Sequence, residues 1–473
     1  MKKFIAIFMM LLAFEGLKAQ GSMIIYSQQD IPQSSYANPA NRFDGRFFIG
    51  IPALSSTDIK WSNRFRYSDA IVKSGDSLKL SFDNLLEEMK DKNYMSVSAK
   101  VDLLSFGISI SDKSQFIFNV SEVASVNFSI SKDMVRFIYE GNAAFENRSA
   151  NFDGLGLNAT HYREYGIALS HQFTDKWRVG LRAKYLYGME NIYTEKIDVQ
   201  FKTDPETYAL QANTDFAIRT SGVDIPEGED ESFYKYINGR NNHGFAVDLG
   251  AHYQFNDKLD ISASLIDWGF ISWKDYTKHY YGEGDFIYDG IEVNSFTNNE
   301  LNIDGETSFD LVLDSLEEEL GVQEGSGRYT SPLVTKFFLG ANYEIDKHSN
   351  VGFLMRNDIF QAKVRPSFSL SYSRQLISWL SVTGVYSSLN NTFDNLGVGF
   401  SVDPGPVQFY LMTDNIIGAF QPQHARNLHL RFGVNLIFGR EKDGPQANVA
   451  KRKTKKSSRR IKSRNKSLQR SDF

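Results

Sequence analysis

Four amphipathic runs of aromatic and aliphatic residues end at the same dipeptide, and a second such run begins directly after each one. The dipeptides are Asp112-Lys113, Asp175-Lys176, Asp257-Lys258 and Asp346-Lys347. Paired runs joined by so short a turn predict β-hairpins. The connections between successive hairpins are long and polar, so one edge of the sheet carries short turns and the other carries large loops. This asymmetry is typical of an outer-membrane β-barrel.

Alternation of apolar and polar residues supports strands that have one apolar and one polar face. In the run from Leu428 to Phe438 every second residue is apolar, whereas His429 and Arg431 lie on the opposite face. The same pattern recurs at residues 178–187, 245–255 and 337–345. A soluble extracellular β-sandwich would alternate in the same way, with its polar face in solvent instead of in a lumen. The loop asymmetry favours the barrel.

The pattern predicts about fourteen strands in an all-β, antiparallel, up-and-down transmembrane barrel. Their expected starts are near Phe47, Val97, Gln115, Tyr162, Trp177, Phe245, Leu259, Thr335, Val351, Phe368, Ser381, Leu396, Val407 and Leu428. An even count places both chain ends on the same side, with the short turns. That side is expected to be the periplasm, because outer-membrane barrels have short periplasmic turns.

The N-terminus reads as a cleavable secretory signal. Met1-Lys2-Lys3 precedes an apolar stretch from Phe4 to Phe14, and the mature chain is expected to begin near Gln20. No later stretch has the roughly 18 to 20 continuous apolar residues of a transmembrane helix, so a membrane would be crossed by strands. The chain has no cysteine, which excludes disulfides, cysteine nucleophiles and thiolate metal sites.

Several short segments carry a family resemblance. Tyr36-Ala37-Asn38-Pro39-Ala40, just before the first strand, resembles the hatch segment of the long-chain fatty-acid transporter superfamily and of the related type IX secretion barrels. Residues 141–145, 162–165, 180–188 and 431–439 resemble an uncharacterised family of Bacteroidota outer-membrane proteins. These resemblances imply a fourteen-stranded barrel plugged by its N-terminal segment, with Tyr36, Asn38, Pro39 and Ala40 as hatch residues.

The expected division of the chain is therefore a signal peptide at residues 1–19, a hatch segment at 20–45, the barrel at 46–439 and a basic tail at 440–473. The last part departs from the fatty-acid transporter pattern, in which the chain ends with the last strand.

Charged residues on the polar strand faces are the candidates to line the lumen. They are Arg182, Lys184, Asp248, His252, Glu344, Arg356 and Arg431. They can form either a packed network that fills the lumen or the walls of a conducting path. No Gly-x-Ser-x-Gly, His-Glu-x-x-His or phosphate-binding glycine loop occurs, so we expect no enzymatic activity, no cofactor and no metal.

The predicted outer loops span Ser68–Tyr94, Lys132–Thr160, Tyr193–Asn242 and Lys274–Ser331. Two of them contain short amphipathic helices, with Ser81 and Ser308 at the N-cap positions. These helices either cover the barrel mouth or simply pack the loops together. Acidic clusters at residues 227–231 and 317–319 either bind the divalent cations that bridge lipopolysaccharide or form a solvated surface.

The C-terminal tail is strongly basic. Between Lys451 and Arg470 it carries eleven Lys or Arg and no acid, which leaves the rest of the chain with a net charge near −16. The candidate anion-binding residues are Lys451, Arg452, Lys453, Lys455, Lys456, Arg459 and Arg460. A periplasmic tail excludes nucleic acid as a partner, so peptidoglycan, membrane phospholipid and an acidic periplasmic protein are the candidates, and a solvated tail is the alternative.

Two functions fit these features in the outer membrane of a Gram-negative bacterium, where the barrel would contact lipid and lipopolysaccharide. The first is a gated conduit for hydrophobic or amphipathic solutes, which leave through the lumen or through a lateral opening near Ile51-Pro52 or Leu103-Leu104. The second is a structural subunit of an assembly or secretion complex, which docks a surface or secretion-machinery protein through its loops and its tail.

Overall fold

The computed structural model describes residues 23–74, 77–223, 239–288, 322–360, 363–389 and 392–440. The predicted signal peptide, the predicted helix after Ser308, both acidic loop clusters and the basic tail lie outside these residues.

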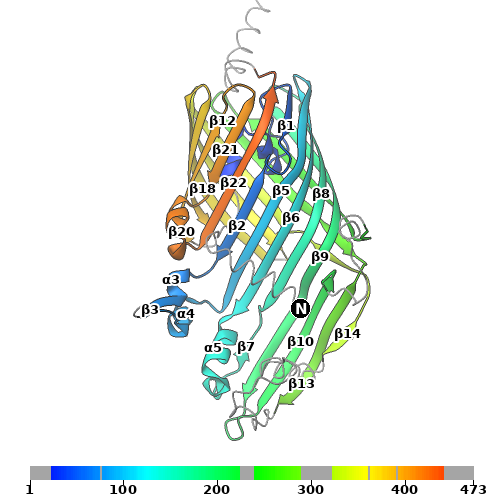
Figure 1. Cartoon of the computed structure of the whole chain (residues 1–473), viewed down its shortest axis with the longest axis vertical. Helices are drawn as coiled ribbons and strands as arrows, with labels where there is room; N and C mark the ends of the chain where they lie inside the picture. The colour runs from blue at the N-terminus through cyan, green and yellow to red at the C-terminus, as the bar shows by residue number, and fades with distance from the viewer. Residues whose placement is uncertain are drawn as a thin grey trace, which may run out of the picture.

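The structure confirms the predicted fold, a closed barrel of fourteen antiparallel strands (Figure 1). The first strand is split into β1 (Phe47–Gly50) and β2 (Thr57–Asn63). The others follow in order as β5 (Lys92–Ser111), β6 (Ser114–Ser131), β8 (Gly156–Gln172), β9 (Trp177–Thr203), β11 (His243–Gln254), β12 (Leu259–Trp273), β16 (Thr335–Asp346), β17 (Ser349–Phe360), β18 (Lys363–Ile377), β19 (Leu380–Leu389), β20 (Thr392–Val402), β21 (Val407–Thr413) and β22 (Asn427–Phe438). Both β1 and β2 pair with β22 and with β5, which closes the ring. Each predicted start lies within its strand.

The hairpin turns owe their shape to the polar residue before the dipeptide. Ser111 Oγ accepts hydrogen bonds from the amides of Lys113 and Ser114, and Thr174 Oγ1 accepts the equivalent pair in the next hairpin. In a third hairpin Asn256 Oδ1 does the same. Such side-chain to backbone bonds stabilise tight turns without a glycine. We call the barrel end that carries these turns the turn end, and the opposite end the loop end.

At the loop end the sheet continues beyond the barrel. The last part of β9 pairs with β10 (Leu210–Ser221), which pairs along its whole length with β13 (Thr277–Tyr288), and β13 pairs with β14 (Gln323–Gly325). The prediction of irregular loops from Tyr193 to Asn242 and from Lys274 to Ser331 was therefore wrong in part. These strands are rich in charge and do not show clear alternation. They are joined by cross-strand ion pairs such as Lys196–Asp215 and Arg219–Glu195, and by an apolar cluster that contains Phe201, Ala212 and Phe286.

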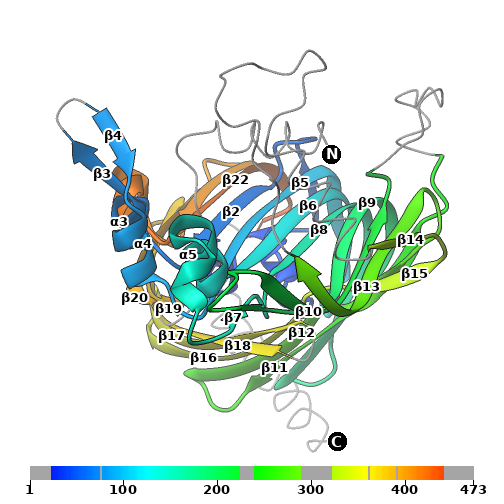
Figure 2. The ribbon, with the colours of Figure 1, turned by 90° about the horizontal axis from the view of Figure 1, so that it is seen from below.

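Short helices and strands complete the loop end. They are α3 (Tyr67–Ala70), β3 (Ile71–Ser74), β4 (Ser77–Leu80), α4 (Phe82–Glu88), α5 (Lys132–Glu140), η2 (Asn142–Phe145), β7 (Ala150–Asn151), β15 (Tyr329–Pro332), α8 (Ile416–Phe420) and η3 (Pro422–His424). Helix α4 begins where it was predicted, with Ser81 Oγ accepting a hydrogen bond from the Asn84 amide. Seen from the loop end, α3 and α4 lie on one side and β13 and β14 on the other (Figure 2). In the described part of the chain, none of the helices has the length and apolarity needed to span a bilayer.

The N-terminal segment lies inside the barrel. It contains α2 (Ile24–Ser27) and η1 (Pro32–Tyr36) and packs against the inner faces of the strands. The largest buried apolar cluster joins it to the wall and consists of Met23, Ile24, Ile25, Tyr26, Ile31, Ala37, Ile266, Phe338, Leu354, Val385, Tyr410 and Met412. The principal core therefore lies between the N-terminal segment and the wall.

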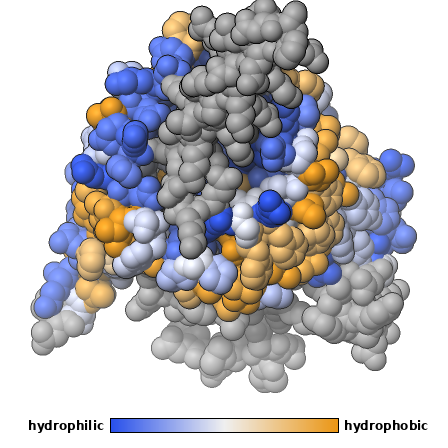
Figure 3. Space-filling model, turned by 90° about the horizontal axis from the view of Figure 1, so that it is seen from above, coloured by the Kyte–Doolittle hydropathy of each residue, from blue (hydrophilic) through white to orange (hydrophobic). Residues whose placement is uncertain are grey.

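The outer face of the wall is apolar. Large hydrophobic side chains that are at least 37% exposed occupy outward positions around the ring, among them Phe47, Leu169, Leu181, Phe245, Phe353, Leu370, Phe400 and Leu411. Apolar side chains appear as orange patches on the flanks of the molecule in Figure 3. An exposed apolar surface of this extent marks a membrane or protein interface.

Candidate functional site: an internal plug between two cavities

Residues 23–44, which we call the plug, are seated in a niche made by two glycines. Gly180 on β9 and Gly250 on β11 are direct partners across the sheet. A Cβ atom at Gly180 would lie 2.1 Å from the carbonyl carbon of Pro39, and one at Gly250 would lie 2.1 Å from Asn38 Oδ1. The wall can approach the backbone of the plug this closely only because both positions lack a side chain.

Polar contacts hold the predicted hatch residues in this niche. Asn38 is fully buried, and its Oδ1 accepts a hydrogen bond from the Ala40 amide. Its Nδ2 lies 3.4 Å from Nε2 of His252, which in turn contacts Asn41 Oδ1 at 2.7 Å. On the other side, His252 Nδ1 lies 2.7 Å from a carboxylate oxygen of Asp260. The plug is therefore hydrogen-bonded to the wall through a buried histidine.

Tyr36 connects the plug to the charged inner face. Its hydroxyl donates to Asp102 Oδ2 at 2.6 Å, and its ring lies under the Arg182 guanidinium at 4.5 Å and the Lys100 ammonium at 4.8 Å. Arg182 also donates to Ser35 Oγ at 3.1 Å. Cation–π contacts of this kind strengthen when they are removed from water, as here.

The first turn of the plug is hydrogen-bonded to Asp414, directly after β21, and to Ser371 on β18. The amides of Met23 and Ile24 both donate to Asp414 Oδ1, at 3.2 and 3.0 Å. The other carboxylate oxygen of Asp414 lies 2.7 Å from Nδ1 of His429. Ser27 Oγ donates to Ser371 Oγ at 3.0 Å. A carboxylate at the N-terminus of a helical turn is favourable because it satisfies amides that have no partner within the turn.

Two cavities lie on opposite sides of this turn. The loop-side cavity has a volume of about 230 Å³, and Ile25 is one of its walls. The turn-side cavity has a volume of about 840 Å³ and is lined by residues 27–30 of the plug together with Arg374, Asp403 and Arg440. The plug thus borders both cavities, and within α2 Ile25 lines one and Ser27 the other.

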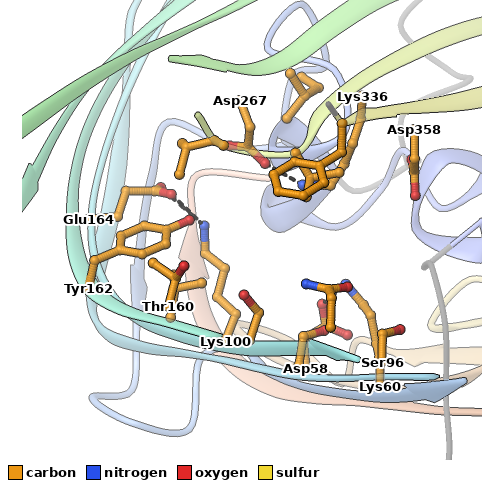
Figure 4. Close-up of a pocket in the computed structure, with 18 of the residues that line it drawn as sticks. Asp58, Lys60, Ser96, Lys100, Thr160, Tyr162, Glu164, Asp267, Lys336 and Asp358 are labelled. Carbon is orange, nitrogen blue, oxygen red and sulfur yellow. Dashed lines mark hydrogen bonds and ion pairs between the residues drawn. The ribbon is translucent and has the colours of Figure 1, made fainter. Parts of the chain in front are cut away.

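A chain of ion pairs runs along one wall of the loop-side cavity. Asp267, whose backbone adopts the left-handed conformation (φ +59°), contacts both Lys184 and Lys336. Lys184 also lies 2.8 Å from Asp248 Oδ2, and Lys100 lies 3.0 Å from Glu164. In Figure 4 the Lys100 ammonium points at Glu164, and Asp267 points at Lys336. Every carboxylate in this chain has a cationic partner, as buried charges require.

Further ion pairs lie next to the two ends of this chain, beside Lys100 and beside Lys336. One carboxylate, Asp58 on β2, contacts Lys60 at 2.6 Å, Nε2 of His429 at 2.8 Å, and Arg431. Arg356 on β17 makes a two-pronged contact with Asp358, at 2.7 and 2.8 Å.

The wall has no opening at the break between β1 and β2. Residues 51–56 bulge outward, with Leu54 about half exposed. Backbone hydrogen bonds nevertheless cross the bulge on both sides: Val434 N to Leu54 O at 2.8 Å toward β22, and Ala53 N to Asp102 O at 2.8 Å toward β5. Position 53 adopts a positive φ to make this connection. The break near Ile51-Pro52 is therefore a sealed bulge in this state.

The residues described here contain no group of three or more His, Asp or Glu side chains arranged to hold a metal ion.

The family model described as "Family of unknown function (DUF5723)" matches residues 39–414, from the niche-bound Pro39 to the plug-binding Asp414. The chain belongs to this family. Among curated protein sequences, none matches the chain.

Solved structures with a remote similarity include three bacterial proteins. The Pseudomonas putida toluene transporter TodX is 9% identical, with 89% of this chain and 97% of that chain covered and a TM-score of 0.39. A Pseudomonas aeruginosa FadL homologue is 9% identical, with 87% and 94% covered and a TM-score of 0.38. The translocator domain of the autotransporter NalP from Neisseria meningitidis is 8% identical, with 89% and 99% covered and a TM-score of 0.31.

The predicted lumen residues of this family member fall into three groups. Arg182 and His252 contact the plug, Lys184 and Asp248 belong to the chain of ion pairs, and Arg431 and Arg356 pair with Asp58 and Asp358, which lie next to its two ends. All six are at most 7% exposed. Glu344 is separate from them, since it is half-buried near the Asp346 turn and lines neither cavity.

Several residues of the site were not singled out from the sequence. They are Asp58, Lys60, Lys100, Asp267, Lys336 and Asp414. For Lys60 and Lys100 the alternation of their strands was a usable signal, because both follow an inward residue by two positions. Arg163 and Glu164 are adjacent in one strand and therefore face opposite sides: Glu164 binds Lys100, and Arg163 donates to Glu122 at 2.8 Å.

Proposed function

We propose that the chain is an outer-membrane β-barrel protein that acts as a gated conduit for amphipathic solutes, with the plug as its gate. The observation that carries this proposal is the single helical turn, α2, between a cavity of about 230 Å³ and one of about 840 Å³. Displacement of the plug, beginning with α2, would join the two cavities.

The wall supports a membrane location. Its outward apolar residues would contact lipid, and aromatic residues such as Tyr165, Tyr185 and Phe245 lie near the loop end of this band. Beyond them Arg163 and Glu122 form an ion pair on the same outward face. This order of apolar, aromatic and charged residues is that of a strand leaving a bilayer. We place the turn end in the periplasm, because short turns face that side in outer-membrane barrels.

The lining of the loop-side cavity supports an amphipathic solute. It combines charged residues with apolar side chains, including Ile25, Val97, Ile266, Phe338 and Phe360. A purely hydrocarbon solute would make no hydrogen bonds to the charged side chains of this lining, and a small ion would make no contact with its apolar side chains. The sealed bulge at residues 51–56 favours exit through the turn-side cavity over exit through the wall at that point.

A disulfide lock tests the gate. Because the chain has no cysteine, the double variant Ser27→Cys/Ser371→Cys introduces the only thiols, at two positions whose hydroxyl oxygens are 3.0 Å apart. The matched control is Ser373→Cys/Thr383→Cys, which joins two wall strands at a similar distance of 2.8 Å without touching the plug.

The readouts are single-channel conductance in KCl and uptake of a neutral alkyl glucoside into liposomes. Oxidation of the Ser27/Ser371 variant should abolish both, and reduction should restore them, while the control should be indifferent to oxidation. Equal flux in the oxidised and reduced forms would show that α2 is not the gate.

A further inference from the structure

The loop-side cavity is cationic in an otherwise acidic protein. Seven Lys or Arg residues line it against four Asp or Glu, whereas the whole chain has a net charge of −5. Most of these cations are neutralised locally: Lys100 by Glu164, Lys184 and Lys336 by Asp248 and Asp267, and Arg356 by Asp358.

The excess positive charge is concentrated where β2 and β22 meet. Lys60 and Arg431 share one carboxylate, that of Asp58, which also contacts His429. Arg356, on β17, lines the same cavity as Lys60 and Arg431. Three cationic side chains, on β2, β22 and β17, thus line one cavity.

The Arg431 guanidinium has hydrogen-bond donors that do not contact Asp58. The residue is 5% exposed, and only its Nη2 reaches Asp58. Its Nε and Nη1 are buried and have no hydrogen-bond partner among the residues that the structure describes. A buried guanidinium with unsatisfied donors costs free energy unless another acceptor completes its coordination, so the site is built for an additional acceptor.

We propose that Lys60 and Arg431, with Arg356 beside them, bind the head group of an anionic amphiphile: a phosphate or sulfate monoester of an apolar alcohol. Guanidinium forks match the spacing of oxyanion oxygens, and a tetrahedral oxyanion offers three terminal oxygens to donors that converge from different strands. The apolar chain of the ester would lie along Ile25, Phe338 and Phe360, which line the same cavity. This inference rests on the proposed conduit and names its class of solute.

The test is equilibrium binding by calorimetry on the purified full-length protein in a neutral detergent. The probes are hexyl phosphate, hexyl sulfate, hexanol, hexyltrimethylammonium and inorganic phosphate. Both esters should bind, and the ammonium and the alcohol should not. Binding of inorganic phosphate with equal affinity would overturn the assignment of an apolar chain, and equal binding of the cationic probe would overturn the site.

Variants locate the site. Lys60→Gln and Arg431→Gln should each weaken ester binding by about tenfold or more, since a hydrogen bond between charged groups is lost. Lys60 has a side chain that is 21% exposed, so its variant keeps the test valid if the Arg431 variant fails to fold. The control is Lys196→Gln, which removes an exposed lysine of the outer extension and should leave binding unchanged. Unchanged affinity in both cavity variants would refute the proposal.

The outcomes also separate this inference from the conduit. Binding does not require transport, so ester binding by a protein that passes no solute would leave the site standing and remove the conduit. Flux of alkyl glucoside by a protein that binds no ester would support the conduit and refute the ester site.

Discussion

Replacement of Asp414 by Asn should loosen the plug. Asp414 is 1% exposed, and one of its oxygens accepts the amides of Met23 and Ile24 at 3.2 and 3.0 Å. A hydrogen bond to a charged group contributes about 1.5–3 kcal/mol, and one between neutral groups about 0.5–1.5 kcal/mol. An asparagine carbonyl can still accept both amides but carries no charge.

The two bonds together should therefore lose about 2–3 kcal/mol, which increases the population of the open plug roughly 30- to 150-fold. The assay uses a cysteine at Ile31, a plug residue that is completely buried, introduced into a chain that has no other cysteine. When closing is faster than labelling, the rate of thiol modification reports the open population. The Ile31→Cys/Asp414→Asn protein should react roughly 30 to 150 times faster than Ile31→Cys alone.

The matched control is Asn415→Ser in the same Ile31→Cys background. Asn415 caps α8 by accepting the Gly418 amide and donates to the Asn427 carbonyl in the wall. Serine preserves the capping bond and loses the bond to Asn427. A threefold or smaller increase for Asp414→Asn would refute the view that this carboxylate holds the plug. An equal increase for Asn415→Ser would show that the effect is a general loosening of the wall.

Two further perturbations act on other parts of the plug. Gly180→Ala places a Cβ about 2.1 Å from Pro39, so the plug should be displaced and conductance should rise. The Cβ of the control variant Gly384→Ala meets nothing within 4 Å, so this variant should conduct as the wild type does. Equal conductance of the two variants would contradict the role of Gly180 in seating the plug. Partial burial and the neighbouring Asp403 carboxylate raise the pKa of Asp30 to about 6. A solvated aspartate has a pKa near 3.9, so between about pH 4 and pH 6 the docked plug binds a proton that the released plug does not. Protonation of Asp30 therefore stabilises the docked plug fully below about pH 4, and this stabilisation is lost as the pH rises through 6. Conductance should therefore be higher at pH 7.5 than at pH 4.5, and Asp30→Asn should abolish that difference; a pH response that persists in the variant would assign it to another group.

The fold was predictable because strands and turns are local. Alternation identified all fourteen strands, and the dipeptide turns identified four of the hairpins. The outer extension was missed because the stretch around Lys196 carries charge on both faces. It is ordered by pairing between distant segments and by an apolar cluster that joins Phe201, Ala212 and Phe286 to α5 and η2, and neither is visible in one strand alone.

The site was predictable only in its parts. Alternation places Gly180 and Gly250 on the inner face, but nothing local shows that both face Pro39, since that contact depends on the closure of the ring and on register. The choice between a packed network and a conducting path was left open, and the structure contains both a chain of ion pairs and a cavity beside it. Asp414 follows the end of β21, where alternation stops, so its role had no periodic signal.

The distribution of contacts along the plug indicates which part would move. Residues 33–44 are fixed by side-chain hydrogen bonds to six separate strands, including a reciprocal pair between Gln33 and Asn435 at 2.9 Å. Helix α2 is a single turn, too short to be stable without its tertiary contacts. Its amides depend on one carboxylate, and water entering from either cavity could replace that acceptor. Local opening of residues 23–31, with residues 33–44 in place, exposes the apolar side chains of α2 and breaks the Tyr26–Ser262 and Ser27–Ser371 hydrogen bonds. It still costs less free energy than release of the whole segment, which also breaks the contacts of residues 33–44.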